Sequence, residues 1–346
     1  MKLSDFDYHL PPERIAQFPS PEREQSRMMV VSRKELTLQH QHFFNIVDWL
    51  NSDDTLVLND SKVIPAKLYG KKETGAAIEM LLLPPPRSTS EDCSLWEVLL
   101  RPGKRIRPGT LITFAGNGEG KVLEQLSEKK WLMEFKTDMP FDTFLSRFGH
   151  APLPPYIDRK NIKNSHHEDH TRYQTVYARH PGSVAAPTAG LHFTTAILQQ
   201  LQKIRVNIVT ITLHVGYGTF TPVEAERIED HQMDREYFEI SPDAARIIST
   251  SRRVIAVGTT STRVLESVAD EKGRLSSLSG YTNLFIYPGH SFKRVNAMLT
   301  NFHLPKSSLY MLASAFGGIN LIRKAYSEAI QVQYRFYSYG DCMLII

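Results

Sequence analysis

The central part of the chain changes its pattern, and this change constrains the fold more strongly than any other feature of the sequence. Between residues 62 and 136, short runs of strand-forming residues alternate with turn signals such as Pro84-Pro85-Pro86 and Gly116-Asn117-Gly118. Runs about 10 residues apart are typical of a small antiparallel β-barrel or sandwich. Strands are expected at residues 76–83, 95–100, 110–114, 120–126 and 131–135, followed by a helix at 141–148.

The segments on either side of this block alternate between strand and helix patterns. We therefore predict an α/β main domain formed by residues 1–60 and 151–346, interrupted by a small antiparallel β-barrel inserted at 61–150. Residues 161–170 are expected to form a polar loop rather than a metal site. In the main domain we expect strands at 28–31, 55–58, 206–215, 254–257, 283–287 and 343–346, and helices at 43–50, 190–203, 309–316 and 321–332, with two more starting at Pro242 and near Gly258.

Composition excludes several classes of protein. Cys93 and Cys342 lie far apart without metal-ligand spacing, which argues against a disulfide scaffold and a cysteine zinc site. An apolar signal segment and a membrane-spanning run are both absent from the sequence, so we expect a cytoplasmic protein. The net charge of +4 permits a polyanionic partner without requiring one.

Residues 181–193 (Pro-Gly-Ser-Val-Ala-Ala-Pro-Thr-Ala-Gly-Leu-His-Phe) form the first candidate binding loop. Its prolines fix φ and its glycines permit unusual conformations, so its amides and hydroxyls are held in place for a polar ligand. The helix expected from Gly190 would point its N-terminus at that ligand. The alternative is a rigid connector that binds nothing.

Two further segments, residues 210–223 and 301–308, also place a histidine beside a glycine or proline break at the end of a regular element. Because α/β proteins build their sites in such loops, we predict one site formed by residues 183–193, 214–222 and 301–306. The pair Gly216 and Gly218 is a weak match to nucleotide-binding loops, since the third glycine is missing.

Charged groups elsewhere suggest additional roles. Asp60 follows an expected strand, where the alternative is a simple capped turn. Residues 229–236 gather proton-transfer groups, although a solvated charge run has the same composition. Four cations on one expected barrel hairpin could contact phosphates or could merely be exposed: Arg101, Lys104, Arg105 and Arg107.

Long motifs in order along nearly the whole chain resemble the S-adenosylmethionine:tRNA ribosyltransferase-isomerase family of the queuosine pathway. They include Asn-Asp-Ser-Lys-Val-Ile-Pro-Ala at 59–66, the loop at 182–193, Thr-Leu-His-Val-Gly at 212–216, Ala-Val-Gly-Thr-Thr at 256–260 and Thr-Asn-Phe-His-Leu-Pro at 300–305. Shorter matches occur at 152–157, 172–178 and 339–341.

The resemblance implies an activity. Such an enzyme attaches the ribosyl group of S-adenosylmethionine, isomerised to an epoxycyclopentane, to the 7-aminomethyl group of a 7-deazaguanine in tRNA; adenine and methionine leave, and epoxyqueuosine-tRNA forms. It also implies an α/β domain with a β-barrel insertion. The expected partners are S-adenosylmethionine, consumed as donor, and tRNA with the aminomethyl base in its anticodon loop. We expect a monomer with neither a metal nor another cofactor, and no contact with a membrane.

At least three proton transfers are required, which calls for imidazoles and carboxylates. The candidate catalytic residues are His192, His214, His231, Glu236, His303 and Asp60, and Asp341 supplies a further carboxylate. Aromatic side chains such as Phe193, Tyr217 and Phe220 would stack on adenine or contact the sulfonium. The candidate substrate-binding residues are Ser183, Thr188, Gly190, Phe193, Gly216, Tyr217, Gly218, Thr219, Phe220, Thr259, Thr260, Asn301 and Lys306.

One position departs from the family pattern His-x-Met-His-x-Glu, because Asp234 stands where the second histidine is expected. Our hypothesis is that His231 and Glu236 face the ligand and that position 234 only shapes the loop. Two rival functions remain at this point: an ordinary tRNA methyltransferase, and an RNA-binding protein without activity.

Overall fold

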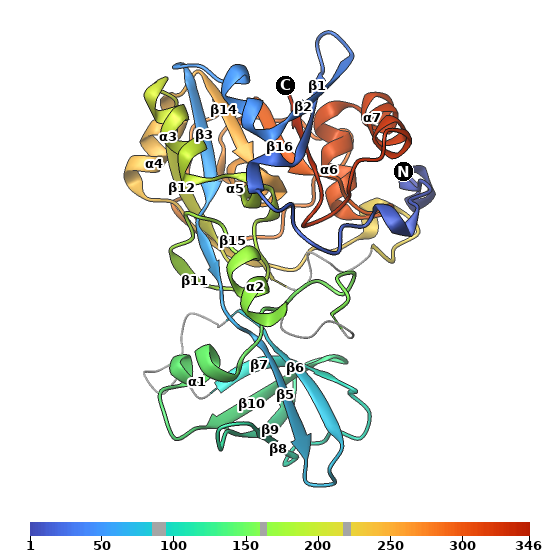
Figure 1. Cartoon of the computed structure of the whole chain (residues 1–346), viewed down its shortest axis with the longest axis vertical. Helices are drawn as coiled ribbons and strands as arrows, with labels where there is room; N and C mark the ends of the chain where they lie inside the picture. Colours follow the sequence, from blue (N-terminus) through green and yellow to red (C-terminus); the bar gives the residue numbers. More distant parts are fainter. Residues whose placement is uncertain (85–94, 160–164, 217–222) are drawn as a thin grey trace.

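A computed structural model describes residues 1–84, 95–159, 165–216 and 223–346. Figure 1 shows a large α/β domain above a smaller barrel, with the chain passing from strand β3 into the barrel. The predicted fold class is confirmed by this arrangement of a mixed sheet with helices and a closed antiparallel barrel.

The main domain is built on a nine-stranded sheet with the order β15-β13-β12-β3-β14-β16-β17-β1-β2. Neighbours β12, β3, β14 and β16 pair in parallel, whereas β17 and β13 run antiparallel to their neighbours β16 and β12. The strands are β1 (Arg27–Ser32), β2 (Thr37–His42), β3 (Asp54–Asn59), β12 (Asn207–Leu213), β13 (Glu236–Glu239), β14 (Arg253–Val257), β15 (Ser279–Thr282), β16 (Ala297–Asn301) and β17 (Cys342–Ile345).

Both faces of this sheet are covered, which explains why its central strands are continuous apolar runs. In β3, Val57 belongs to the core on one face, while Leu56 and Leu58 belong to the core on the other. The first core packs under α4 (Pro242–Thr250), α5 (Gly258–Val268), α6 (Ser308–Gly317) and α7 (Ile319–Gln331), and the second under α3 (Thr195–Lys203) and the 3₁₀ helix η4 (Phe43–Trp49).

The inserted unit is a closed six-stranded barrel with the order β10-β7-β6-β5-β8-β9. Its strands alternate between buried and more exposed residues, and apolar side chains such as Met80, Val98 and Val122 fill the interior. Helix α1 (Phe141–Phe148) packs against the same core through Phe144. The strands are β5 (Lys67–Lys72), β6 (Ala77–Leu82), β7 (Leu95–Arg101), β8 (Leu111–Phe114), β9 (Glu119–Gln125) and β10 (Lys130–Lys136).

The basic segment that follows β7 is not a hairpin, which corrects the prediction for Arg101, Lys104, Arg105 and Arg107. Strands β7 and β8 flank this segment, but β6 and β5 lie between them in the barrel. The segment is therefore a crossover connection at one end of the barrel. All four cationic residues are exposed.

Other differences concern element boundaries. The helix expected at 190–203 is a 3₁₀ helix, η5 (Thr188–His192), followed by α3, because the Thr194 side chain caps Ile197 N–H and starts a separate helix. The strand expected at 283–287 lies instead at β15, and α2 (Ser165–Arg172) occupies part of the segment expected to be a loop.

In the described part of the chain, no helix is both long and apolar enough to cross a membrane.

Candidate active site

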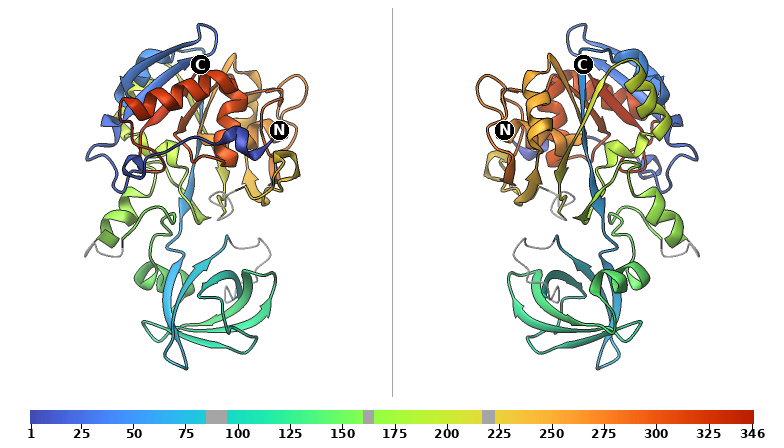
Figure 2. Two further views of the ribbon diagram at one scale, coloured as in Figure 1. Left: turned by 90° about the vertical axis from the view of Figure 1, so that its right-hand side faces the viewer. Right: turned by 90° about the vertical axis from the view of Figure 1, so that its left-hand side faces the viewer.

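Several candidate residues lie at one edge of the main sheet, where its parallel strands end. Figures 1 and 2 show that this edge faces the barrel. The parallel strands β3, β12, β14 and β16 all end there. Strand β13 runs in the opposite direction, so its first residue, Glu236, lies at the same edge. Sites of α/β proteins form where parallel strands end.

Loop 183–193 links the two other loops of the predicted site. Ser183 Oγ accepts a hydrogen bond of 2.9 Å from Val215 N–H, and Val184 N–H donates to the Val215 carbonyl over 3.1 Å. At its other end, Thr188 Oγ1 donates to Asn301 Oδ1 over 2.9 Å. The described parts of the three loops therefore lie together.

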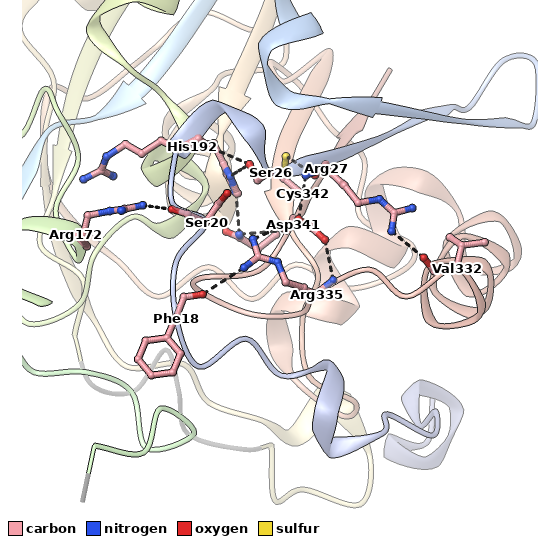
Figure 3. Close-up of polar contacts among 12 residues, drawn as sticks. Phe18, Ser20, Ser26, Arg27, Arg172, His192, Val332, Arg335, Asp341 and Cys342 are labelled. Carbon is pink, nitrogen blue, oxygen red and sulfur yellow. Dashed lines mark hydrogen bonds and ion pairs between the residues drawn. The ribbon is translucent and has the colours of Figure 1, made fainter. Parts of the chain in front are cut away.

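His192 is held as a neutral imidazole at this junction (Figure 3). Its Nε2 accepts from Asn301 Nδ2 (3.1 Å), so Nδ1 carries the proton and donates to Ser26 Oγ (2.6 Å). Burial, together with Arg335 and Arg23, lowers the pKa of His192 to about 3. With both nitrogens engaged, this ring orients the loop.

Asp341 lies in the same cluster (Figure 3), at the start of β17. Its carboxylate accepts hydrogen bonds from the backbone N–H groups of Arg27 (2.9 Å) and Arg335 (2.7 Å). Burial raises its pKa, and these bonds oppose that shift. The carboxylate thus ties the N-terminal and C-terminal segments together beside His192.

His214 follows β12, and its half-buried ring lies against the backbone of Gly182. A Cβ atom at position 182 would lie 2.9 Å from His214 Cε1, and Gly182 has a φ of +137°. Only glycine satisfies both conditions without strain. The loop therefore fixes the position of this imidazole.

The substitution Gly182→Ala is expected to lower the free energy of unfolding by about 1–3 kcal/mol, the usual range for a strained, overpacked position. Denaturant unfolding measures it. Gly103→Ala is the matched control, because the nearest contact of its Cβ is a carbonyl oxygen at 3.5 Å and its φ is not in the positive region. Equal stability of the two variants would contradict this account.

Asp60 is buried directly after β3. Its Oδ1 accepts from Thr212 Oγ1 over 2.7 Å, and its Oδ2 lies 3.8 Å from Nε2 of the exposed His180. Burial is the main cause of the raised pKa of Tyr177, and the negative charge of Asp60 raises this pKa further. The carboxylate is therefore anchored on one oxygen and faces an imidazole on the other.

Glu236 forms a buried ion pair with Arg263 of α5, a residue that sequence reasoning missed. The other carboxylate oxygen of Glu236 accepts from Gly216 N–H over 3.1 Å. Arg263 is 1% exposed, and within the described residues its Nε and Nη1 have no hydrogen-bond partner. The available signal was an arginine inside a helix whose other residues are mostly hydroxyl-bearing or aliphatic, but sequence alone does not show its burial.

Thr175 and Tyr177, two hydroxyl-bearing residues that sequence reasoning missed, lie beside loop 183–193, and Thr260 was among the predicted substrate-binding residues. Within the part of the chain that the structure describes, the buried hydroxyls of Thr175, Tyr177 and Thr260 have no hydrogen-bond partner. A Cβ at Gly190 would lie 2.0 Å from Tyr177 Oη and 2.9 Å from Thr175 Cγ2, so these two side chains touch the loop backbone directly. A buried unpaired hydroxyl costs about 1–3 kcal/mol, which a bound polar ligand would offset.

A family model described as queuosine biosynthesis protein matches residues 3–345. The chain belongs to this family. It is 55% identical to a protein of Syntrophus aciditrophicus and 49% identical to one of Halothermothrix orenii, each over the full length of both chains. Both are named S-adenosylmethionine:tRNA ribosyltransferase-isomerase.

A solved structure of S-adenosylmethionine tRNA ribosyltransferase from Thermotoga maritima is similar to this queuosine biosynthesis protein, with 34% identity and a TM-score of 0.55. The match covers 99% of this chain and all of that one. The resemblance expected from the sequence motifs is thereby confirmed, together with the fold class.

Some candidates of this queuosine biosynthesis protein lie away from the shared edge. His303 is buried among aromatic rings, where Nε2 lies 2.7 Å from Thr300 Oγ1 and burial lowers its pKa to about 3. Lys306 forms an ion pair with Asp7 over 2.6 Å. The ring of Phe193 is fully buried and packs edge-on against Phe43, in the core beneath the loop.

The remaining candidates divide into described and undescribed residues. Thr259 and Thr260 are buried in the first turn of α5, and His231 packs edge-on against Phe285 at 5.1 Å. Partial burial lowers the pKa of His231, and the Asp234 carboxylate opposes that shift. Four candidates lie outside the described residues: Tyr217, Gly218, Thr219 and Phe220. Within the described residues, no group of three or more His, Cys, Asp or Glu side chains could hold a metal ion.

Proposed function

We propose that this chain is an S-adenosylmethionine:tRNA ribosyltransferase-isomerase. It transfers and isomerises the ribosyl moiety of S-adenosylmethionine to the 7-aminomethyl group of 7-aminomethyl-7-deazaguanine in tRNA, giving epoxyqueuosine-tRNA, adenine and methionine. The observation that carries the proposal is identity of 55% over the full length to a relative with this name. The clustered imidazole and carboxylates at one sheet edge supply the groups that such a reaction needs.

The reaction begins at the donor. A sulfonium acidifies the adjacent C5′–H, so a base can remove that proton and start the ribose rearrangement. Adenine must then leave with a proton on nitrogen, and the ammonium of the acceptor must lose one before its nitrogen forms the new C–N bond. We assign the proton transfers to His214, Asp60 and Glu236, because these three lie at the edge where the strands end.

His192 has a different role in this proposal. Its two nitrogens are occupied by Ser26 and Asn301, so it cannot accept a proton without breaking the network that holds the loop. We infer that it positions Ser183–Phe193 around the donor. The hydroxyls of Thr175, Tyr177 and Thr260 support donor binding at this loop, since a polar ligand would supply their partners.

The proposal needs no metal or redox cofactor, because the donor itself supplies the leaving groups. We propose that the protein is cytoplasmic, since it acts on tRNA, and that it is a monomer. Sedimentation with and without tRNA would measure the oligomeric state.

One assay separates this function from its rivals. The protein is incubated with S-adenosylmethionine and tRNA bearing the aminomethyl base, and small products are identified by mass spectrometry. Adenine and methionine in equal amounts are expected. S-adenosylhomocysteine would indicate a methyltransferase, and an unchanged donor would indicate a protein that only binds RNA.

The basic crossover of the barrel is proposed to contact tRNA phosphates. Replacing Arg101, Lys104, Arg105 and Arg107 by alanine is expected to weaken tRNA binding and to reduce the slope of log K against log[salt] by about 3, if four contacts to single-stranded phosphates are lost. Fluorescence anisotropy across a salt series measures the slope. An unchanged slope would mean that these exposed cations are only solvated.

A further inference from the structure

A cavity of about 570 Å³ lies between the barrel and the main domain. Sequence reasoning did not find it. Its floor is the outer face of three neighbouring barrel strands, β5, β6 and β7, and its opposite wall is the proline-rich segment 151–155. Val184 also lines it, so the cavity reaches the first residues of loop 183–193.

The pairing of the strands explains why six side chains face the cavity together. In one row Lys67 pairs with Leu81 and Leu81 with Leu99; in the next row Tyr69 pairs with Glu79 and Glu79 with Arg101. Successive side chains of a strand point to opposite faces, so all six lie on the face opposite to Leu68, Met80 and Leu100, which fill the barrel. Strands β5, β6 and β7 are successive antiparallel neighbours, so the two rows cross all three strands.

The floor combines an aromatic ring with both signs of charge. Tyr69 is 50% exposed, and its ring meets His150 edge-on at 5.1 Å. Backbone hydrogen bonds in both directions between Lys67 and His150 hold that pair in place. Lys67 Nζ lies 3.3 Å from Glu79 Oε1, which orients the carboxylate beside the ring.

We propose that this cavity receives the target nucleotide of the tRNA, turned out of the anticodon loop. Proteins recognise single-stranded RNA by stacking its bases on exposed aromatic rings and by hydrogen bonding to their edges. A guanine-type base fits this floor: its ring stacks on Tyr69, its N1–H and exocyclic amine donate to Glu79, and its phosphate lies near Arg101. The volume lies within the usual range of ligand pockets, about 300–1,000 Å³.

This inference rests on the proposed function and adds the location of its acceptor substrate. Val184, the second residue of the loop assigned to the donor, also lines this cavity, so a base held here lies near that loop. The basic crossover continues from Arg101, so neighbouring phosphates of the loop would meet Lys104 and Arg105.

The test compares two RNA stem-loops in fluorescence anisotropy: one with 7-aminomethyl-7-deazaguanine at the target position, and one abasic there. The wild-type protein is expected to bind the first roughly 5- to 150-fold more tightly, which is the affinity ratio expected when one base stacks on an aromatic side chain. Tyr69→Ala should lose most of this ratio, because only the hydrogen bonds to Glu79 remain, and Tyr69→Phe should keep the wild-type ratio. Phe44→Ala, an exposed aromatic of the main domain, is the matched control and should also keep it.

Glu79→Gln tests recognition of the base edge, with Glu134→Gln on β10 as its control. The first variant is expected to lose preference for a guanine-type base over adenine at the target position, and the second to retain it. Calorimetry with S-adenosylmethionine alone should give the same affinity for wild type and Tyr69→Ala.

Three results would overturn the cavity proposal: equal binding of both stem-loops by the wild type, a wild-type ratio in Tyr69→Ala, or weaker donor binding in that variant with the ratio unchanged. The proposed function fails separately, through the absence of adenine release from the modified stem-loop, even where the binding ratio is as expected.

Discussion

The substitution Glu236→Ala is expected to lower turnover at least about a hundredfold, the low end for a general acid–base group. The carboxylate is 4% exposed, accepts from Gly216 N–H and is paired with the buried Arg263. Removing it leaves an arginine without its counter-charge, which typically costs about 3–5 kcal/mol of stability. Adenine release under saturating substrate measures turnover, and thermal unfolding measures the cost to the fold.

Two neighbours complete this test. Asp234 is exposed, so Asp234→Ala is expected to keep most of the turnover. His231→Ala should lose as much as the glutamate variant, because our hypothesis from the sequence is that His231 faces the ligand together with Glu236. Glu236→Gln removes the negative charge but keeps an oxygen that can accept from Gly216 N–H. Its turnover therefore shows whether the reaction requires the charge or only this hydrogen bond. A collapse of turnover in Asp234→Ala but not in His231→Ala would reverse the assignment.

Acid is expected to destabilise the fold strongly below neutral pH. Burial lowers the pKa of His192 and of His303 to about 3, from about 6.5 in the unfolded chain. The unfolded state therefore binds more protons below pH 6.5, so this stability is fully present above that pH and is lost as pH falls towards 3. At pH 5 each residue is expected to account for a loss of about 2 kcal/mol.

Urea unfolding at pH 7 and pH 5 measures this loss. In His303→Gln the difference between the two pH values is expected to be about 2 kcal/mol smaller than in the wild type. His42→Gln provides the control, because His42 is exposed and its replacement should leave the difference unchanged. A His303→Gln variant with the wild-type difference would refute the account.

The sequence could predict those parts of the fold that depend on local pattern. Continuous apolar runs such as Leu56–Val57–Leu58 and the helix cap at Ser241 follow from neighbouring residues, and both are present in the structure. The short strands β15 and β13 at one side of the sheet were harder. β15 was placed four residues too late and the four-residue strand β13 was missed, because such short strands depend on a neighbour rather than on their own pattern.

The site was predictable only in part for a similar reason. Proline and glycine marked loop 183–193, but the burial of Arg263, the closeness of Tyr177 to Gly190 and the row Tyr69–Glu79–Arg101 arise from contacts between distant segments. Periodicity also could not show whether residues 101–110 form a hairpin, since that depends on the order in which the barrel closes.

The position of β17 has a consequence for synthesis of the chain. This last strand lies inside the sheet, between β16 and β1, and its residues pair with Met28–Val31 from the start of the sequence. The ribosome must therefore release residues 342–345 before β1 and β2 can join the rest of the sheet. The barrel strands, contiguous in sequence, can close while translation continues, so the barrel of the nascent protein would form well before the sheet is complete.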